Sequence, residues 1–312
     1  MPIKIDRAGI QAISKLELLA KQAVEGFITG LHKSPFHGFS VEFAEHRHYN
    51  TGESTRHLDW KLLARTEKYF VKRYEEETNL RCHILLDVSP SMYFPSDVKA
   101  DDKSWNKIKF GIYAAAALNE MMLHQRDATG LTTFSDKIHI STRAGSSAVH
   151  RNYIVSILEG LLNDMNNIPK STSHVAGVLH EIADSIHRRS MVIIISDMLD
   201  NAGNSDAVFS ALQHLRHNKH DVVMFHLADH DLEVNFNYDN RPHTFVDLES
   251  QEEIKVNPAD IREIYLEKMT EFRKQIRIKA AQYKVDYIDT DINNGFAQVL
   301  MQYLIRRQKM LV

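Results

Sequence analysis

Two short segments of the sequence place carboxylate and hydroxyl groups directly after runs of apolar residues. Asp87, Ser89 and Ser91 alternate along the segment after one such run, and Asp197 lies at the end of another. Their oxygen atoms are the ligands that small hard cations such as Mg²⁺ prefer, and neither sulfur nor imidazole accompanies them. The combination therefore predicts an octahedral site for Mg²⁺ or Mn²⁺. The alternative is that the aspartates cap loops and the serines occupy turns.

Buried parallel strands would bring these two segments together. From Arg81 onward, short apolar runs alternate with amphipathic helical segments, which predicts an α/β fold with a mainly parallel sheet covered by helices on both faces. Ligands of such sheets gather at the carboxyl ends of the strands, where both segments lie. The expected strands are residues 83–86, 129–134, 137–141, 191–195, 222–227 and 285–288, with 137–141 as an antiparallel edge. The expected helices are residues 105–126, 148–165, 175–187, 205–218, 258–283 and 295–307.

The first 79 residues have a different texture and predict a small N-terminal α+β cap. An amphipathic helix is expected over residues 6–31 and a second, short one over residues 58–65. Alternating segments at residues 39–43 and 69–74 predict strands, and residues 50–53 form an expected turn. We therefore expect two parts, residues 1–79 as helix and cap and residues 80–312 as the sheet domain.

The serine-rich segment is similar to the Asp-x-Ser-x-Ser signature of von Willebrand factor A domains, whose metal-ion-dependent adhesion site binds a divalent cation through three loops. The segment that ends at Asp197 resembles the third loop of that site. Aligning residues 176–179 with the helix that follows the second loop places Ser173 there, with Thr172 one residue away, so both are candidates for that ligand. The resemblance implies a von Willebrand A-type, Rossmann-like fold and a metal site made of Asp87, Ser89, Ser91, Ser173 and Asp197.

Motifs in the N-terminal part resemble those of the bacterial domain-of-unknown-function 58 family, in which the cap leads directly into an A-type domain. The resemblance runs from about Leu16 to Leu199, and more loosely to the C-terminus, although Gly52-Glu53 stands where the family usually shows Gly-Asp. It implies association with MoxR-type AAA+ ATPases, as an adaptor or metal-dependent chaperone partner, and no established catalytic activity. The motifs are residues 38–43, Arg47, Tyr49, Gly52, Glu53, Arg56, Asp59, Trp60, Ala64, Arg65 and residues 71–75.

The function that we expect is a non-enzymatic, divalent-metal-dependent protein-interaction module. A cation held mainly by neutral hydroxyls keeps excess positive charge and can complete its shell with an Asp or Glu of a protein partner. The alternative is a Mg²⁺-dependent hydrolase, such as a phosphoesterase, that uses the same cation as a Lewis acid. The sequence names no general base for it, and it lacks the glycine-rich nucleotide motifs and the Gly-x-Ser-x-Gly elbow.

Composition and charge restrict which class of partner and which cellular compartment we expect. The 38 Lys and Arg nearly balance the 41 Asp and Glu, so charge does not favour nucleic acid. A single cysteine, Cys82, cannot form an internal disulfide and fits a reducing compartment. The longest apolar runs are far shorter than the roughly 20 residues of a membrane-spanning helix. We therefore expect a soluble cytoplasmic protein without a membrane segment.

Histidines offer a second candidate metal site. His214, His217 and His220 follow one another at three-residue spacing near the end of an expected helix, and His46 and His48 flank an arginine on or beside a strand. No cysteine or carboxylate at a diagnostic spacing joins either group. Histidine near a helix C-terminus is favoured by the helix dipole, so we interpret these residues as solvated surface.

Overall fold

The computed structural model of the chain describes residues 16–26, 46–48, 63–65, 69–72, 80–99, 104–169, 175–199, 205–248, 250–296 and 299–305. The chain divides into two compact units, one made of Met1–Glu25 with Leu80–Val312 and the other of Gly26–Asn79. The sequence assigned the N-terminal helix to the cap, whereas this division groups it with the sheet. Leu16, Ala20 and Val24 are buried, at the spacing of one helix face, which explains the grouping.

A six-stranded sheet in the order β10-β7-β6-β3-β4-β5 forms the centre of the larger unit. All neighbouring pairs are parallel except β4 and β5, which are antiparallel. This confirms the predicted α/β fold with a mainly parallel sheet and an antiparallel edge strand. The strands are β3 (Arg81–Asp87), β4 (Ala128–Phe134), β5 (Ile138–Ser141), β6 (Met191–Ser196), β7 (Asp221–Ala228) and β10 (Asp286–Asp291).

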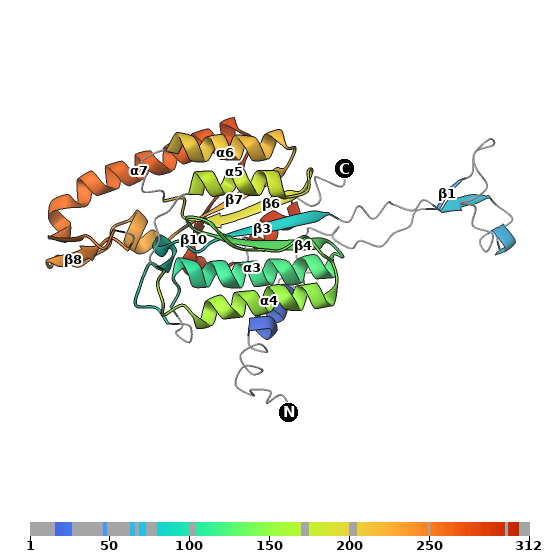
Figure 1. The fold of residues 1–312 in the computed structure, drawn as a ribbon, viewed down its shortest axis with the longest axis horizontal. Coiled ribbons are helices and arrows are strands. Elements are labelled where there is room, and N and C mark those ends of the chain that lie inside the picture. The colour runs from blue at the N-terminus through green and yellow to red at the C-terminus, as the bar shows by residue number, and fades with distance from the viewer. Residues whose placement is uncertain are drawn as a thin grey trace, which may run out of the picture. The chain divides into compact units, whose positions relative to one another are not determined.

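Helices cover both faces of this sheet, as the alternating pattern predicted. α3 (Lys107–His124) and α4 (Ala148–Asn163) lie on one face, and α5 (Val175–Ser185), α6 (Ser205–His217) and α7 (Pro258–Gln282) lie on the other (Figure 1). A further helix, described over residues 299–305, lies within the expected segment 295–307. The two central strands β3 and β6 are therefore buried on both sides, which explains the continuous apolar runs Ile84–Leu86 and Met191–Ile195 within them.

The side chains of the central strands alternate between the two faces. Leu85, Val192 and Ile194 belong to the cluster under α5, α6 and α7. Leu86 and Ile195 point to the other face, where a Cβ added to Gly111 of α3 would lie 2.7 Å from Cδ1 of Leu86. α3 therefore approaches the sheet closely at a glycine.

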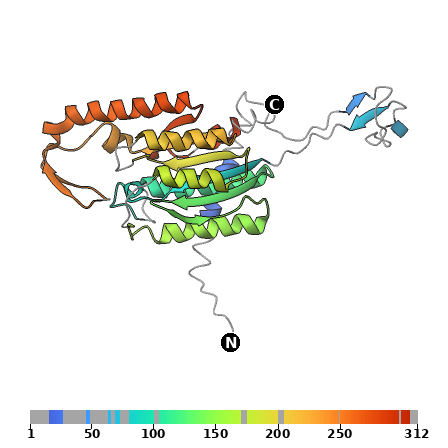
Figure 2. The same cartoon turned by 45° about the horizontal axis from the view of Figure 1, so that its top comes forward.

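The chain between β7 and α7 forms an insertion that the sequence analysis did not predict. It contains a short π-helix, η3 (His230–Val234), and an antiparallel hairpin of β8 (His243–Val246) and β9 (Glu253–Val256). The hairpin and the first turns of α7 extend beyond the end of the sheet (Figure 2). Stacked rings of Phe236 and Phe245 stabilise its base.

The smaller unit is described only in part. β1 (His46–His48) and β2 (Phe70–Lys72) pair antiparallel, and residues 63–65 are helical. The second strand overlaps the expected strand 69–74, whereas the expected strand 39–43 and turn 50–53 lie outside the described residues. In the part of the chain that the structure describes, no helix is both long and apolar enough to cross a membrane.

Candidate metal centre

The two predicted metal-binding segments meet at the carboxyl edge of the sheet. Asp87 is the last residue of β3, Asp197 directly follows β6, and these two strands are parallel neighbours in which Leu86 pairs with Ile195. The chain leaves β3 toward α3 on one face and leaves β6 toward α6 on the other (Figure 1). The strand order thus reverses between them, and open α/β sheets bind their ligands at such a switch point.

Hydrogen bonds hold the carboxylate of Asp87 in place. Its Oδ1 accepts the backbone N–H of Ser89 at 2.8 Å, and its Oδ2 accepts the hydroxyl of Ser196 at 2.6 Å. Ser196 also accepts the backbone N–H of Met198 at 2.9 Å. The side chain at the last position of each strand thus accepts a backbone N–H of the loop that follows, and the carboxylate of Asp87, which is only 1% exposed, is fixed at the strand end.

The two serine hydroxyls connect the first loop to Asp197. The Oγ atoms of Ser89 and Ser91 lie 3.1 Å apart, and the hydroxyl of Ser91 donates to Oδ1 of Asp197 at 3.2 Å. Pro90 begins the short 3-10 helix η2 (Pro90–Tyr93), which orients Ser91. Four of the five predicted ligands, Asp87, Ser89, Ser91 and Asp197, thus come together, whereas Ser173 and the alternative Thr172 lie outside the described residues.

Burial and charge make this cluster electrostatically unusual. Burial, followed by the negative charge of Asp197, raises the pKa of Asp87 from 3.8 to about 7. The hydrogen bonds from Ser196 and Ser89 act in the opposite direction but do not compensate. The two buried carboxylates at neighbouring strand ends therefore favour the binding of a positively charged group.

A buried ammonium group, which the sequence analysis did not predict, supplies part of that charge. Nζ of Lys107 lies 2.7 Å from Oδ2 of Asp197 and 2.7 Å from Oε1 of Glu233. Burial by itself would lower the pKa of Lys107, but these two carboxylates raise it above its usual value. The side chain is 1% exposed and carries its charge inside the protein.

Glu233 reaches the cluster from η3, the π-helix after β7. Its Oε2 accepts the backbone N–H of Asp229 at 2.8 Å, and its backbone carbonyl accepts the hydroxyl of Tyr265 in α7 at 2.8 Å. The rule that ligands gather at strand ends applies equally to β7 and would have directed attention to this segment. Lys107 begins the helix after the serine loop, so its position in sequence was a usable signal as well.

The chemistry of the donors fits a hard divalent cation. All donors are oxygens, and two are neutral hydroxyls, which suits Mg²⁺ or Mn²⁺ better than Zn²⁺. When ionised, the three carboxylates of Asp87, Asp197 and Glu233 exceed the one ammonium of Lys107 by two negative charges. A divalent cation would neutralise this excess.

The histidines at three-residue spacing do not form a metal site in the described residues. Nδ1 of His214 lies 3.1 Å from Nδ1 of His180, and its Nε2 lies 3.2 Å from Asp184. The interpretation as solvated surface is wrong for His220, which is buried and accepts the backbone N–H of Ser190 at 3.3 Å. Among the described residues, no group of three or more His, Cys, Asp or Glu is placed to hold a metal ion.

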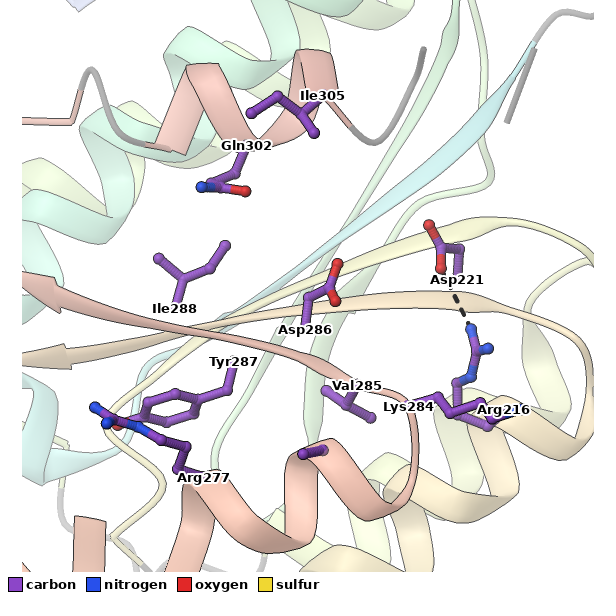
Figure 3. Close-up of a pocket in the computed structure, with 11 residues that line it drawn as sticks. Arg216, Asp221, Arg277, Lys284, Val285, Asp286, Tyr287, Ile288, Gln302 and Ile305 are labelled. Atoms are coloured by element: carbon purple, nitrogen blue, oxygen red, sulfur yellow. Dashed lines mark hydrogen bonds and ion pairs between the residues drawn. The ribbon is translucent and has the colours of Figure 1, made fainter. Parts of the chain in front are cut away.

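A separate pocket of about 590 Å³ lies at the opposite end of the sheet, beside the amino ends of β7 and β10 (Figure 3). Within it, Arg216 forms an ion pair with Asp221 at 3.3 Å, and the guanidinium of Arg277 lies over the ring of Tyr287 at 5.9 Å. The position is unlike the ligand-binding edge of such folds. The pocket is lined by Arg216, Asp221, Arg277, Ala281, Lys284, Val285, Asp286, Tyr287, Ile288, Gln302 and Ile305.

Sequence comparison identifies the family of this chain. Residues 45–275 match the family described as protein of unknown function DUF58. The chain belongs to this family. The match includes the cap motifs from Arg47 onward and the loop that carries Asp87, Ser89 and Ser91, so the family expected from the sequence is confirmed.

Curated relatives of this DUF58 chain come from two mycobacterial species. Uncharacterized proteins of Mycobacterium tuberculosis and Mycobacterium bovis are 26% identical over 194 residues, which are 60% of this chain and 56% of each relative. The chain thus spans about half the length of the curated relatives it matches.

Two solved structures resemble the chain at low identity. The conserved hypothetical protein BatB of Bacteroides thetaiotaomicron is 14% identical with a TM-score of 0.45, covering 74% of this chain and 99% of that one. A serine-substituted aerotolerance-related membrane protein of Bacteroides fragilis is 15% identical with a TM-score of 0.45, covering 72% and 97%.

Proposed function

We propose that this DUF58 domain is a non-enzymatic protein-interaction module that binds a partner through a divalent cation, Mg²⁺ or Mn²⁺, at the carboxyl edge of its sheet. The observation that carries the proposal is the convergence of Asp87, Ser89, Ser91 and Asp197 at the switch point between β3 and β6. These side chains come from segments more than 100 residues apart in the chain.

The arrangement suits binding because the hydroxyls are neutral ligands. Ser89 and Ser91 add no charge of their own, and a small hard cation bound beside them can keep a coordination position open for a further oxygen ligand. A carboxylate of a partner protein is the natural group to complete the shell of such an ion. The cation would then bridge the two proteins.

We further propose that the partner is a MoxR-type AAA+ ATPase and that the domain acts as its adaptor or chaperone partner. The support for this step is the resemblance of the cap motifs and metal loop to the family, together with the match over residues 45–275. The buried cluster adds the chemical requirement that the partner presents an Asp or Glu.

The test is the affinity for a purified MoxR-type ATPase from the same organism, measured in Mg²⁺ and in EDTA. We expect binding in Mg²⁺, loss of binding in EDTA, and loss of binding in Ser89→Ala. Ser156→Ala is the matched control, because Ser156 is an exposed serine of α4 whose hydroxyl donates to the backbone of Tyr153. Binding that is equal in EDTA and in the Ser89 variant would refute the metal-bridged mode.

A further inference from the structure

Lys107 is held at the metal cluster by the start of α3. Its backbone N–H donates to the carbonyl of Phe94 at 3.1 Å, and the side chain of the preceding residue, Asn106, caps the helix by accepting the N–H of Lys109 at 3.0 Å. The ring of Phe94 lies 5.7 Å from Nζ of Lys107. The backbone of Lys107 is therefore fixed by the start of α3, and the ring of Phe94 packs beside its ammonium group.

The ammonium depends on its two carboxylates. A buried charge is tolerated only when it is paired and hydrogen-bonded, and Asp197 and Glu233 each accept one hydrogen bond of 2.7 Å from Lys107. Asp197 is shared, however. Its Oδ1 accepts the Ser91 hydroxyl at 3.2 Å and the backbone N–H of Leu199 at 3.2 Å, while its Oδ2 accepts the ammonium.

A divalent cation at the proposed site must therefore share Asp197 with a resident positive charge. Two like charges at one carboxylate repel each other, and the repulsion is strong in a buried site because little water screens it. Glu233 offers the ammonium a second partner at the same distance. Lys107 can thus remain paired with Glu233 when Asp197 binds a divalent cation.

We infer that Lys107 is an internal counter-ion that competes with the divalent cation for Asp197, and that Glu233 retains the ammonium when the cation binds. The two residues together set the affinity of the site for metal. This inference rests on the proposed metal-dependent function and assigns to it two residues outside the serine loop.

The inference predicts opposite effects for the two partners of one ion pair. Lys107→Met removes the competing charge at similar side-chain length, so metal affinity should rise by about tenfold or more. Glu233→Gln leaves the ammonium with Asp197 as its remaining carboxylate, so metal affinity should fall by about tenfold. In the double variant, the Glu233 change should have a much smaller effect, because its action passes through Lys107.

The measurement is titration calorimetry with MgCl₂ and MnCl₂ on the full chain, for wild type, both single variants and the double variant. Lys109→Met is the matched control, since Lys109 is a buried lysine of the same helix whose Nζ contacts the carbonyls of Lys99 and Ser104. Its metal affinity should equal that of the wild type. Thermal unfolding in EDTA and in Mg²⁺ provides a second measurement, in which Mg²⁺ should raise the Tm of Lys107→Met more than that of the wild type.

The possible results distinguish the role of Lys107 from the proposed metal-dependent function. Metal binding by wild type with the same affinity in Lys107→Met overturns the role of Lys107 and leaves the proposed function standing. No metal binding by wild type or Lys107→Met overturns the metal site and this inference together. Should Lys107→Met fail to fold, the Glu233→Gln titration still decides, because unchanged or tighter metal binding there contradicts the role of the pair.

Discussion

Replacing Asp87 by Asn should change the pH dependence of stability in a defined direction. The carboxyl of Asp87 has a pKa of about 7 in the folded protein and an ordinary value of 3.8, so the folded state binds a proton more tightly than the unfolded chain. Its contribution to stability is fully present below pH 4 and is lost as the pH rises through 7. The amide of Asn has nearly the same shape, does not titrate, and keeps an acceptor for the Ser89 N–H.

The size of the effect follows from the two pKa values. A shift of about three units corresponds to about 4 kcal/mol of unfolding free energy when the carboxyl is ionised in both states. Between pH 5 and pH 8, linkage gives a loss of about 2.5 kcal/mol in the metal-free protein. Asp87→Asn lacks this titrating group, so between pH 5 and pH 8 its unfolding free energy should rise by about 2.5 kcal/mol relative to that of the wild type.

Urea unfolding in EDTA at pH 5 and pH 8 measures this difference, since titrating groups shared by the two proteins cancel in it. Adding Mg²⁺ at pH 8 should stabilise the wild type and leave Asp87→Asn unchanged, because the cation replaces the proton at the cluster. Parallel pH profiles for the two proteins would refute the raised pKa. An equal stabilisation of both by Mg²⁺ would refute the placement of the metal beside Asp87.

Three shorter predictions concern packing, metal choice and catalysis. Gly111→Ala should destabilise the fold by about 1–3 kcal/mol, because its Cβ would lie 2.7 Å from Cδ1 of Leu86. Its control Gly160→Ala in α4, where a Cβ meets nothing within 4 Å, should instead gain roughly 1 kcal/mol, both measured by urea unfolding. In calorimetry, Mg²⁺ or Mn²⁺ should bind better than Zn²⁺, and Zn²⁺ binding that survives Asp87→Ala but not His217→Ala would move the site to the histidines. Phosphatase and nuclease assays with Mg²⁺ and Mn²⁺ should show no turnover, whereas turnover that disappears in Asp87→Ala would favour the hydrolase.

The order of the elements in the sheet domain could be predicted because it depends on local pattern. The six strands of the central sheet lie within one or two residues of their expected ends at most boundaries, because buried strands carry short apolar runs such as Ile84–Leu86 and Val192–Ile195. The helices follow from amphipathic spacing between those strands. The family also followed from the sequence, because its motifs occupy short continuous segments.

The hairpin β8–β9 could not be predicted in the same way. Its strands are only four residues long, and their outward side chains are exposed, so no run of apolar residues marks them. The rings that hold it come from separate segments, with Phe236 beside Tyr265 of α7 at a centroid distance of 4.3 Å. That contact exists only after α7 has packed against the insertion.

The sequence by itself determined which oxygens lie at the carboxyl ends of β3 and β6. The apolar runs that form β3 and β6 end directly before Asp87 and close to Asp197, and the spacing of Ser89 and Ser91 supplies the hydroxyls. Only the tertiary structure decided which charges face them. Lys107 lies 90 residues from Asp197 and 126 residues from Glu233 in the chain, so sequence position could point to each segment but no local pattern shows that the three side chains pair. The fold alone brings the start of α3 and the π-helix after β7 to one buried site, and the strength of ion pairing there depends on that exclusion of water.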